Sequence, residues 1–465
     1  MTPQPSWSAD QPAPSRGEPR ELILAVGAPA HGGHCVARPV DDPGGRVIFV
    51  RHALPGETVR ARLTEMTSRT WRADAVEILQ ASPDRVESVW PEAGPAGVGG
   101  GELAHVALDA QRTWKRWVLA DCLRRIGGQE VADAVAALPE ASAAAAVPIE
   151  PMPTDAAAQA SNSARRRALA GTATRTRVSL TVGEDGRAGM HAFRSGTVLP
   201  LRRLPLAVEA ITEIGLLERS RWRAHYRPGM RIEAIAPSGG EPVVLLDERL
   251  LTAQARSTGR RRVREVVDAS ALGLGKLTYS VHAEGFWQVH VDAPRVLVER
   301  VVRGALGADL DGAAGSRVLE LYSGAGLFTL PLAALVGRGG EVVSLDGNEQ
   351  AVRDARRTLH DQPSARLASG RVSARSVREL AGSLTGGRPD VVVLDPPRQG
   401  AGREVIEAVG ALGAERIVLV ACDPAALARD LETLLRSGYA LGSMSALDMF
   451  PHTHHFETIA VLERS

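Results

Sequence analysis

Four short apolar runs in the C-terminal part of the chain constrain its fold more than any other feature. They read SRVLELYS, GEVVSLDG, DVVVLDPP and RIVLVACD, and each is followed by a helical pattern. Strands that alternate with helices at this spacing build a parallel sheet with helices on both faces. The sequence therefore predicts a doubly wound, Rossmann-like α/β domain over residues 291–465.

The N-terminal part predicts a small β-barrel. Residues 1–20 are rich in Pro, Ser and Gln without hydrophobic periodicity, so we expect a disordered tail there. Over residues 21–80, short Val- and Arg-rich runs are separated by Gly and Pro at hairpin spacing, which is typical of a barrel. Four arginines of this region are candidate phosphate contacts, although each could equally be an ordinary solvated side chain: Arg38, Arg46, Arg60 and Arg62.

Between these two parts, residues 81–290 predict a mixed α/β central domain. An amphipathic pattern predicts a helix over residues 108–126, which could pack on the C-terminal domain, and a second helix is expected over residues 205–218. The stretch 131–173 is rich in alanine, and its pattern does not decide whether it is ordered.

Composition excludes several classes of protein. No run reaches the roughly 18 to 20 apolar residues of a membrane helix, and the segment after Met1 lacks the apolar core of a secretory signal, so we expect a cytoplasmic protein without membrane contact. Three isolated cysteines form neither a disulfide framework nor a zinc site. Because 55 basic and 54 acidic residues leave a net charge of +1, a nucleic-acid partner requires a local basic surface. A monomer is the default expectation.

The segment VLELYSGAGLFTLPLA predicts a cofactor site. A buried strand ends at Tyr322, and Gly324 and Gly326 open the next helix at the edge of the sheet where such folds bind ligands. The same glycines could simply pack a helix on a strand. Asp346 ends the second strand, where an acidic residue bonds the hydroxyls of a ribose. Thr329 occupies the place of the third glycine of a pyrophosphate loop, which favours S-adenosylmethionine over NAD.

The ends of the later strands carry candidate catalytic residues. Asp395 ends a strand expected beside the first one, so it faces both cofactor and substrate, unless it only caps a strand bounded by prolines. Cys422 ends another strand next to a helix N-terminus, which should favour its thiolate. Glu457 lies near the final strand, after a His-rich loop that lacks the spacing of metal ligands, so no metal is expected.

These motifs resemble the RNA uracil-5 methyltransferase family. The likeness rests on LYSGAGLFTLPLA, LDPPRQG, ACDPAALARDL and DMFPHTHHFETI, in that order after GFWQVH, and residues 21–80 resemble the TRAM RNA-binding barrel. The resemblance implies an S-adenosylmethionine-dependent enzyme that forms 5-methyluridine in transfer or ribosomal RNA. It implies that Cys422 is the nucleophile and Glu457 the base. It also implies that Asp395 belongs to the pocket of the cofactor and the uracil. The cofactor contacts that it implies are Gln288, Tyr322 and Asp346.

The chain also departs from the family pattern. Many relatives carry four cysteines for an iron–sulfur cluster, and our alignment places Trp90, Val98, Gly101 and Leu204 at these positions. The three cysteines of this chain lie in distant motifs, so we expect no cluster. Leu327 stands where the family often has Asn, which removes one polar cofactor contact.

Two other functions stay open at this point. A methyltransferase acting on cytosine C5 or on a base amine would share the fold, although amine methylation needs no thiol. A non-catalytic RNA-binding factor would keep the fold without the reaction. Only thiol attack at C6 of uracil gives a lasting adduct with RNA that contains 5-fluorouridine.

Overall fold

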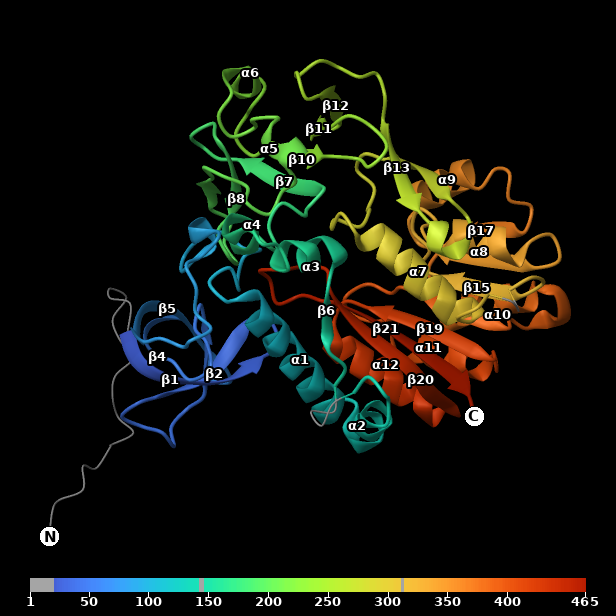
Figure 1. Cartoon of the computed structure of the whole chain (residues 1–465), viewed down its shortest axis with the longest axis horizontal. Coiled ribbons are helices and arrows are strands. Elements are labelled where there is room, and N and C mark those ends of the chain that lie inside the picture. The colour runs from blue at the N-terminus through green and yellow to red at the C-terminus, as the bar shows by residue number, and fades with distance from the viewer. Residues whose placement is uncertain (1–20, 142–145, 311–312) are drawn as a thin grey trace, which may run out of the picture. The chain divides into compact units, whose positions relative to one another are not determined.

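The computed structural model describes residues 21–141, 146–310 and 313–465 (Figure 1). The chain separates into two compact units, residues 1–85 and 86–465. The tail expected over residues 1–20 lies outside the described residues. The domain boundaries inferred from the sequence stay predictions.

The first unit is a closed five-stranded barrel in the order β1-β2-β3-β5-β4. Alternate residues of its strands are buried, among them Leu24, Val26, Val59, Ala61 and Ala73, as expected for strands with one face toward a core. The barrel therefore matches the fold predicted from the spacing of its hairpins. Its strands are β1 (Glu21–Ala30), β2 (His34–Pro39), β3 (Ile48–Arg51), β4 (Thr58–Met66) and β5 (Trp71–Gln80).

The second unit begins with helices and one short strand. Helix α1 packs on helix α12 (Pro424–Arg436), and β6 pairs with β20 (Tyr439–Asp448) at the edge of the C-terminal sheet. Most of the alanine-rich stretch is thus part of the fold, while residues 142–145 lie outside the described residues. The elements are α1 (Leu108–Arg125), α2 (Gly128–Ala136), β6 (Ile149–Pro151), α3 (Pro153–Gln159) and α4 (Ala164–Ala168).

An antiparallel sheet and a hairpin follow. The six-stranded sheet has the order β12-β11-β10-β7-β8-β9, and β13 pairs with β14. The helix expected over residues 205–218 is wrong in extent: α5 has only four residues, and Gly215 with φ 74° ends the turn after it. The elements are β7 (Arg177–Val182), β8 (Ala188–His191), β9 (Val198–Pro200), α5 (Glu209–Thr212), α6 (Ser220–Arg223), β10 (Arg231–Ile235), β11 (Val243–Leu246), β12 (Arg249–Thr252), β13 (Arg262–Asp268) and β14 (Lys276–His282).

The C-terminal sheet has the order β17-β16-β15-β18-β19-β21-β20-β6. Strands β15 to β19 are mutually parallel, and β21 is antiparallel to both of its neighbours. This is the predicted doubly wound sheet, with β18 beside β15. Its strands are β15 (Arg317–Leu321), β16 (Glu341–Asp346), β17 (Ala365–Ser369), β18 (Val391–Leu394), β19 (Arg416–Ala421), β20 (Tyr439–Asp448) and β21 (Glu457–Arg464).

Helices cover both faces of this sheet (Figure 1). Helices α7, α8 and α9 pack in one apolar core, whereas α10, α11 and α12 join α1 and α2 in another. Since the strands are buried on both sides, they read as continuous apolar runs. The helices are α7 (Ala293–Leu306), α8 (Thr329–Val336), α9 (Glu349–Thr358), α10 (Ala374–Gly382), α11 (Arg403–Ala411) and α12 (Pro424–Arg436).

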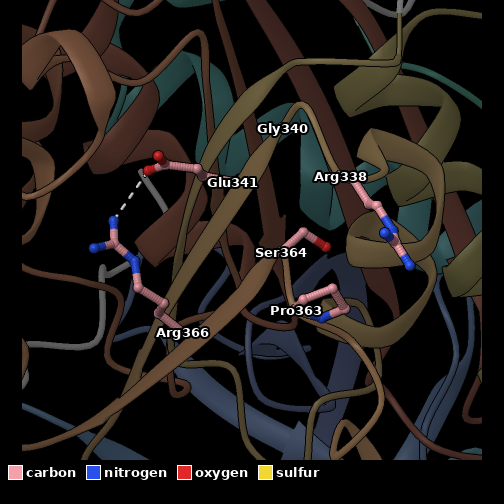
Figure 2. A pocket seen from close by; sticks show the side chains of 6 residues that line it. All are labelled: Arg338, Gly340, Glu341, Pro363, Ser364 and Arg366. Carbon is pink, nitrogen blue, oxygen red and sulfur yellow. Dashed lines mark hydrogen bonds and ion pairs between the residues drawn. The ribbon is translucent and has the colours of Figure 1, made fainter.

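The two edges of the sheet differ in what they expose. A polar hollow of about 590 Å³ lies at the amino-terminal ends of β16 and β17, where Arg366 pairs with Glu341 (Figure 2). Open α/β sheets bind ligands at the opposite, carboxyl-terminal edge, and the candidate site lies there. Among the described residues, no helix is long and apolar enough to span a membrane.

Candidate active site

A cavity of about 890 Å³ opens at the carboxyl-terminal ends of the parallel strands. It brings together seven of the eight predicted site residues, which come from four loops and two strand ends: Gln288, Tyr322, Gly324, Asp346, Asp395, Cys422 and Glu457. Gly326 does not line it. A Cβ on Gly326 would lie 3.2 Å from Leu359 Cδ1 and 3.3 Å from Ala355 Cβ, so this glycine allows α9 to approach the loop.

The glycine loop is joined to the next strand through Asp346. Gly324 N donates to Asp346 Oδ2 at 2.8 Å, and Asn348 N donates to Oδ1 at 2.7 Å. Tyr322 has φ 64° and Gly324 has φ 54°, so the backbone turns sharply directly after β15. A left-handed conformation at a non-glycine residue is costly and is concentrated at functional sites. The turn aligns Tyr322, Gly324 and Asp346 along one wall of the cavity.

A buried carboxyl group supports this loop from below. Glu320 Oε2 accepts hydrogen bonds from Thr329 Oγ1 and Ser344 Oγ, both at 2.6 Å. Burial raises the pKa of Glu320 to about 7, although the two hydroxyl bonds oppose the shift. We did not single out Glu320 from the sequence. The available signal was an acidic residue inside an otherwise apolar strand, with Thr329 in place of a loop glycine.

Cys422 follows β19 and precedes the first turn of α12. The helix is capped by Asp423, whose Oδ1 accepts from Ala425 N at 3.0 Å and Ala426 N at 2.8 Å. Burial is the main cause that raises the pKa of the Cys422 thiol to about 12, with the charges of Glu457 and Asp395 adding to the shift and Arg398 opposing it. The expectation that the helix N-terminus favours the thiolate is therefore wrong, because desolvation and two carboxylates outweigh the helix end.

The two carboxyl groups share the same surroundings as the thiol. Glu457 begins β21 and is only 6% exposed. Burial raises the pKa of Glu457 well above its ordinary value, while Asp395 adds to this shift and Arg398 opposes it. Burial and the neighbouring Asp346 raise the pKa of Asp395 to about 7. A carboxylate with a raised pKa is a stronger base than a solvated one, so Glu457 suits proton abstraction.

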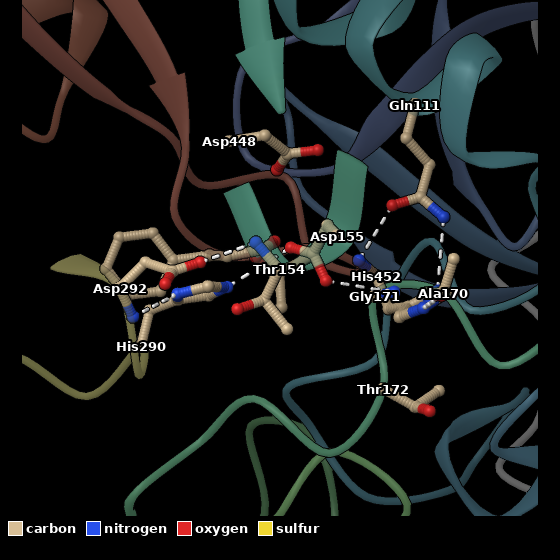
Figure 3. A network of polar contacts seen from close by, with 12 residues as sticks. Gln111, Thr154, Asp155, Ala170, Gly171, Thr172, His290, Asp292, Asp448 and His452 are labelled. Atoms are coloured by element: carbon tan, nitrogen blue, oxygen red, sulfur yellow. Dashed lines mark hydrogen bonds and ion pairs between the residues drawn. The ribbon is translucent and has the colours of Figure 1, made fainter. Parts of the chain in front are cut away.

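The loop that leads to Glu457 is held by helix α1. Lys115 pairs with Asp448 and donates to Phe450 O at 3.1 Å. One turn earlier in α1, Gln111 Oε1 accepts from His452 N at 2.7 Å (Figure 3). All of these polar side chains are buried. Sequence reasoning missed both anchors, because their partners lie more than 300 residues away in the chain.

The three histidines of this loop contact protein groups. His452 Nδ1 lies 3.1 Å from Gln111 Nε2, His454 Nδ1 lies 3.8 Å from Glu102 Oε2, and the His455 ring packs edge-on against Phe450. In the described part of the chain, no three His, Cys, Asp or Glu side chains are arranged to hold a metal ion. The expectation that the loop binds no metal stays a prediction.

The four positions where many relatives carry cluster cysteines form an apolar core here. Trp90, Val98 and Leu204 are buried in one cluster of side chains. A Cβ on Gly101 would lie 2.9 Å from Trp90 Cε3 and 2.7 Å from Ala93 Cβ, so the indole ring is packed directly against this glycine. None of the four residues offers a thiolate, and three of them belong to one apolar cluster. These residues do not fit an iron–sulfur cluster.

The remaining wall of the cavity is basic and aromatic. Arg175 and Arg177 line it, and Arg177 is paired with Glu265 at 3.3 Å. Phe286 also lines the cavity, yet 75% of the residue is exposed. An exposed aromatic ring beside a site is suited to stack on a nucleobase. Sheet order, glycine loop and cavity together define a Rossmann-like methyltransferase.

Comparison with known proteins identifies the family. Residues 275–465 match the family model described as tRNA (Uracil-5-)-methyltransferase, and residues 20–76 match the TRAM domain. An uncharacterized RNA methyltransferase of Streptomyces avermitilis is 38% identical over 95% of this chain and 98% of its own length. The chain belongs to the RNA uracil-5 methyltransferase family, whose members use S-adenosylmethionine.

Two further proteins are similar over nearly their whole length. A 23S rRNA (uracil(1939)-C(5))-methyltransferase of Acinetobacter baumannii is 30% identical over 96% of both chains. The crystal structure of the Pyrococcus abyssi tRNA (uracil-54, C5)-methyltransferase in complex with S-adenosyl-L-homocysteine covers 95% of this chain and 99% of its own, with a TM-score of 0.61 and 20% identity. The latter likeness supports the fold.

Proposed function

We propose that the chain forms 5-methyluridine in RNA, with Cys422 as the nucleophile and Glu457 as the base. The observation that carries this assignment is that the Cys422 thiol and the carboxyls of Glu457 and Asp395 line the same cavity as the glycine loop. Uracil C5 is too weak a nucleophile to accept a methyl group directly, so a thiol that adds to C6 is the group the reaction requires.

The cofactor is assigned to the wall made by the glycine loop. Gln288, Tyr322, Gly324 and Asp346 would hold S-adenosylmethionine, which supplies the methyl group as an electrophile. Gly326 supports this wall from behind. Asp395 lies between the loop and Cys422, so we assign it to both the cofactor and the uracil ring. The loop thus orients two reactants, and orientation is the main source of rate for an in-line transfer.

The protein groups divide the proton steps between them. A carboxylate of the cavity takes the proton of the Cys422 thiol, and the sulfur bonds to C6, which places negative charge on C5 and O4. C5 then takes the methyl group. The carboxylate of Glu457 removes the proton that C5 still carries, the bond from Cys422 to C6 breaks, and the ring is restored. The raised pKa values of both groups suit this sequence, because Cys422 is held as a thiol until it attacks and a carboxylate with a raised pKa is a stronger base.

Ribosomal RNA is the first substrate to test. The similar protein of Acinetobacter baumannii is named for a uridine of 23S rRNA, whereas the structural neighbour is named for a uridine of tRNA. A base inside a helix would have to be flipped out, so a uridine in a loop is the favoured target. We also propose that the enzyme acts as a cytoplasmic monomer. We propose that it holds no iron–sulfur cluster, since Trp90, Val98, Gly101 and Leu204 stand at the ligand positions and offer no thiolate.

The activity is tested with methyl-labelled S-adenosylmethionine and unmodified transcripts of 23S rRNA and tRNA. We expect the label in 5-methyluridine after digestion to nucleosides. Cys422→Ala should abolish transfer and keep cofactor affinity within about twofold, whereas Cys122→Ala, at a buried thiol of α1, should stay active. Label in 5-methylcytidine or in a methylated amine would replace the uracil assignment, and RNA binding without transfer would indicate a binding factor.

The base is tested by following the covalent intermediate. Glu457→Gln should accumulate a methylated RNA–protein adduct that survives denaturing electrophoresis, because its release requires removal of the C5 proton. Glu463→Gln is the matched control, since Glu463 lies on the same strand and pairs with Arg416 away from the site. Free product formed by Glu457→Gln at the normal rate would exclude Glu457 as the base.

A further inference from the structure

One stretch of the chain is basic without any acidic residue. Residues 156–183 contain five arginines and no Asp or Glu, although the whole chain has 54 acidic residues. The arginines are Arg165, Arg166, Arg167, Arg175 and Arg177. Such a local excess of arginine creates a positive surface. The composition does not reveal it, because the net charge of the whole chain is only +1.

Helix α4 presents the first three of these arginines to solvent. Arg165, Arg166 and Arg167 are all exposed, and none of them forms an ion pair with a carboxylate of the described residues. Arg167 donates to Ser161 O at 2.7 Å. Two arginines of the N-terminal barrel differ from those of α4 because they form ion pairs, Arg60 with Glu77 and Arg62 with Glu21. The charge of α4 is therefore available to an external anion.

The segment that follows α4 contacts loops of the candidate active site. Ala170 O lies 3.3 Å from Nε2 of the buried His452, in the loop that leads to Glu457. Gly171 N donates to Asp155 Oδ1 at 3.1 Å, and Asp155 Oδ2 contacts His290 Nε2 at 3.1 Å (Figure 3). His290 follows Gln288 by two residues. The arginine helix is thus joined to two segments that line the cavity.

Further along the same stretch, the chain enters the cavity itself. Arg175 lines the cavity and is half-buried, and its guanidinium donates to Gly100 O at 3.2 Å. Seven residues lie between Arg167 and Arg175. The stretch therefore carries positive charge from an exposed helix to the wall of the pocket that holds Cys422.

We propose that α4 is a docking surface for the RNA backbone, where Arg165 and Arg166 bind phosphates of the strand whose uridine enters the cavity. The inference rests on the proposed function and names the part of the protein that holds its substrate. Arginines that neutralise phosphates contribute binding energy that falls with salt concentration, without reading sequence. The strand then continues along the stretch toward Arg175.

Charge reversal at α4 tests this surface. In Arg165→Glu/Arg166→Glu, the KM for a 23S rRNA transcript at 0.15 M salt should rise about tenfold, and the slope of log affinity against log salt should fall by about 1 to 1.5. The turnover number and the affinity for S-adenosylmethionine should stay within about twofold. Arg165→Lys/Arg166→Lys should retain most of the salt slope, because lysine also neutralises phosphate.

The matched control is Arg124→Glu/Arg125→Glu. These exposed arginines end α1, about 20 Å along the helix from Gln111, and share Asp121. An equal loss of RNA affinity and salt slope in this control would overturn the inference, as would an α4 variant that binds RNA like wild type. RNA binding is measured by filter retention, so it is independent of activity. If wild-type protein binds RNA but methylates no transcript, the proposed function fails while the docking surface is still decided.

Discussion

Burial shifts the candidate catalytic groups toward their uncharged forms, because desolvation outweighs the attraction of nearby positive charges. The pKa of Cys422 is raised to about 12, and that of Asp395 to about 7. The helix N-terminus beside Cys422 suggests the opposite, and the sequence alone could not reveal which effect is larger. The depth of burial and the neighbouring carboxylates depend on three separate loops. The pKa values of this site therefore depend on contacts between loops that are distant in the chain.

The thiol pKa provides a residue-scale prediction. Glu457→Gln removes a negative charge that disfavours the thiolate, so it should lower the pKa of Cys422, whereas Arg398→Gln should raise it further. Alkylation by iodoacetamide requires the thiolate, so its rate rises with pH until the thiol is ionised. We expect the pH profile of alkylation to move to lower pH in the first variant and to higher pH in the second.

Two controls accompany the alkylation profile. Cys422→Ala gives the background from Cys35 and Cys122, which are buried, and Glu463→Gln changes the same residue type on the same strand outside the site. If Glu457→Gln and Glu463→Gln leave the profile equally unchanged, Glu457 does not control the charge of the thiol. The proposed effect of the Glu457 charge on the pKa of the Cys422 thiol would then be excluded.

At the scale of elements, the important contact is between α1 and the loop that joins β20 to β21. The apolar residues of α1 predicted the helix, and α1 spans residues Leu108–Arg125. The same pattern could not predict that Gln111 and Lys115, one turn apart on one face, are buried. Their partners follow β20, and pairing over such a separation leaves no local signal. Polar residues on a helix face are usually solvated, so these two were left out of the candidate site.

Gln111→Leu tests this anchor. The substitution leaves the backbone N–H of the buried His452 without its acceptor, which should lower the free energy of unfolding by about 1 to 3 kcal/mol in urea denaturation. Because the loop positions Glu457, the turnover number should fall more than the KM for RNA rises, and adduct should accumulate. Gln129→Leu is the control, since Gln129 is exposed on α2 and bonds only to Asp133.

At the scale of the whole molecule, local patterns were sufficient for the barrel and for the doubly wound sheet, where strands that alternate with helices follow a known topology. They were insufficient for β6, a strand of three residues that joins the C-terminal sheet beside β20 from the middle of the chain. The central sheet was also only coarsely predicted, because β10 pairs with β7 across about 50 intervening residues that carry no recurring strand–helix pattern to indicate the pairing. Contacts between distant segments decide both features.

The core around Trp90 provides the last prediction. The Trp90 ring packs in the apolar cluster at the positions where many relatives carry cluster cysteines. Trp90→Ala should therefore lower the free energy of unfolding by about 3 to 5 kcal/mol, the cost of a large cavity in a core. Protein purified without oxygen should contain no stoichiometric iron, and a chelator should leave its midpoint of thermal unfolding unchanged. Bound iron whose removal lowers the midpoint would contradict this account, because a ligand that stabilises the native state must bind it preferentially. Since the apolar packing needs no oxidation-sensitive group, we expect the wild-type protein to keep its full stability after exposure to air.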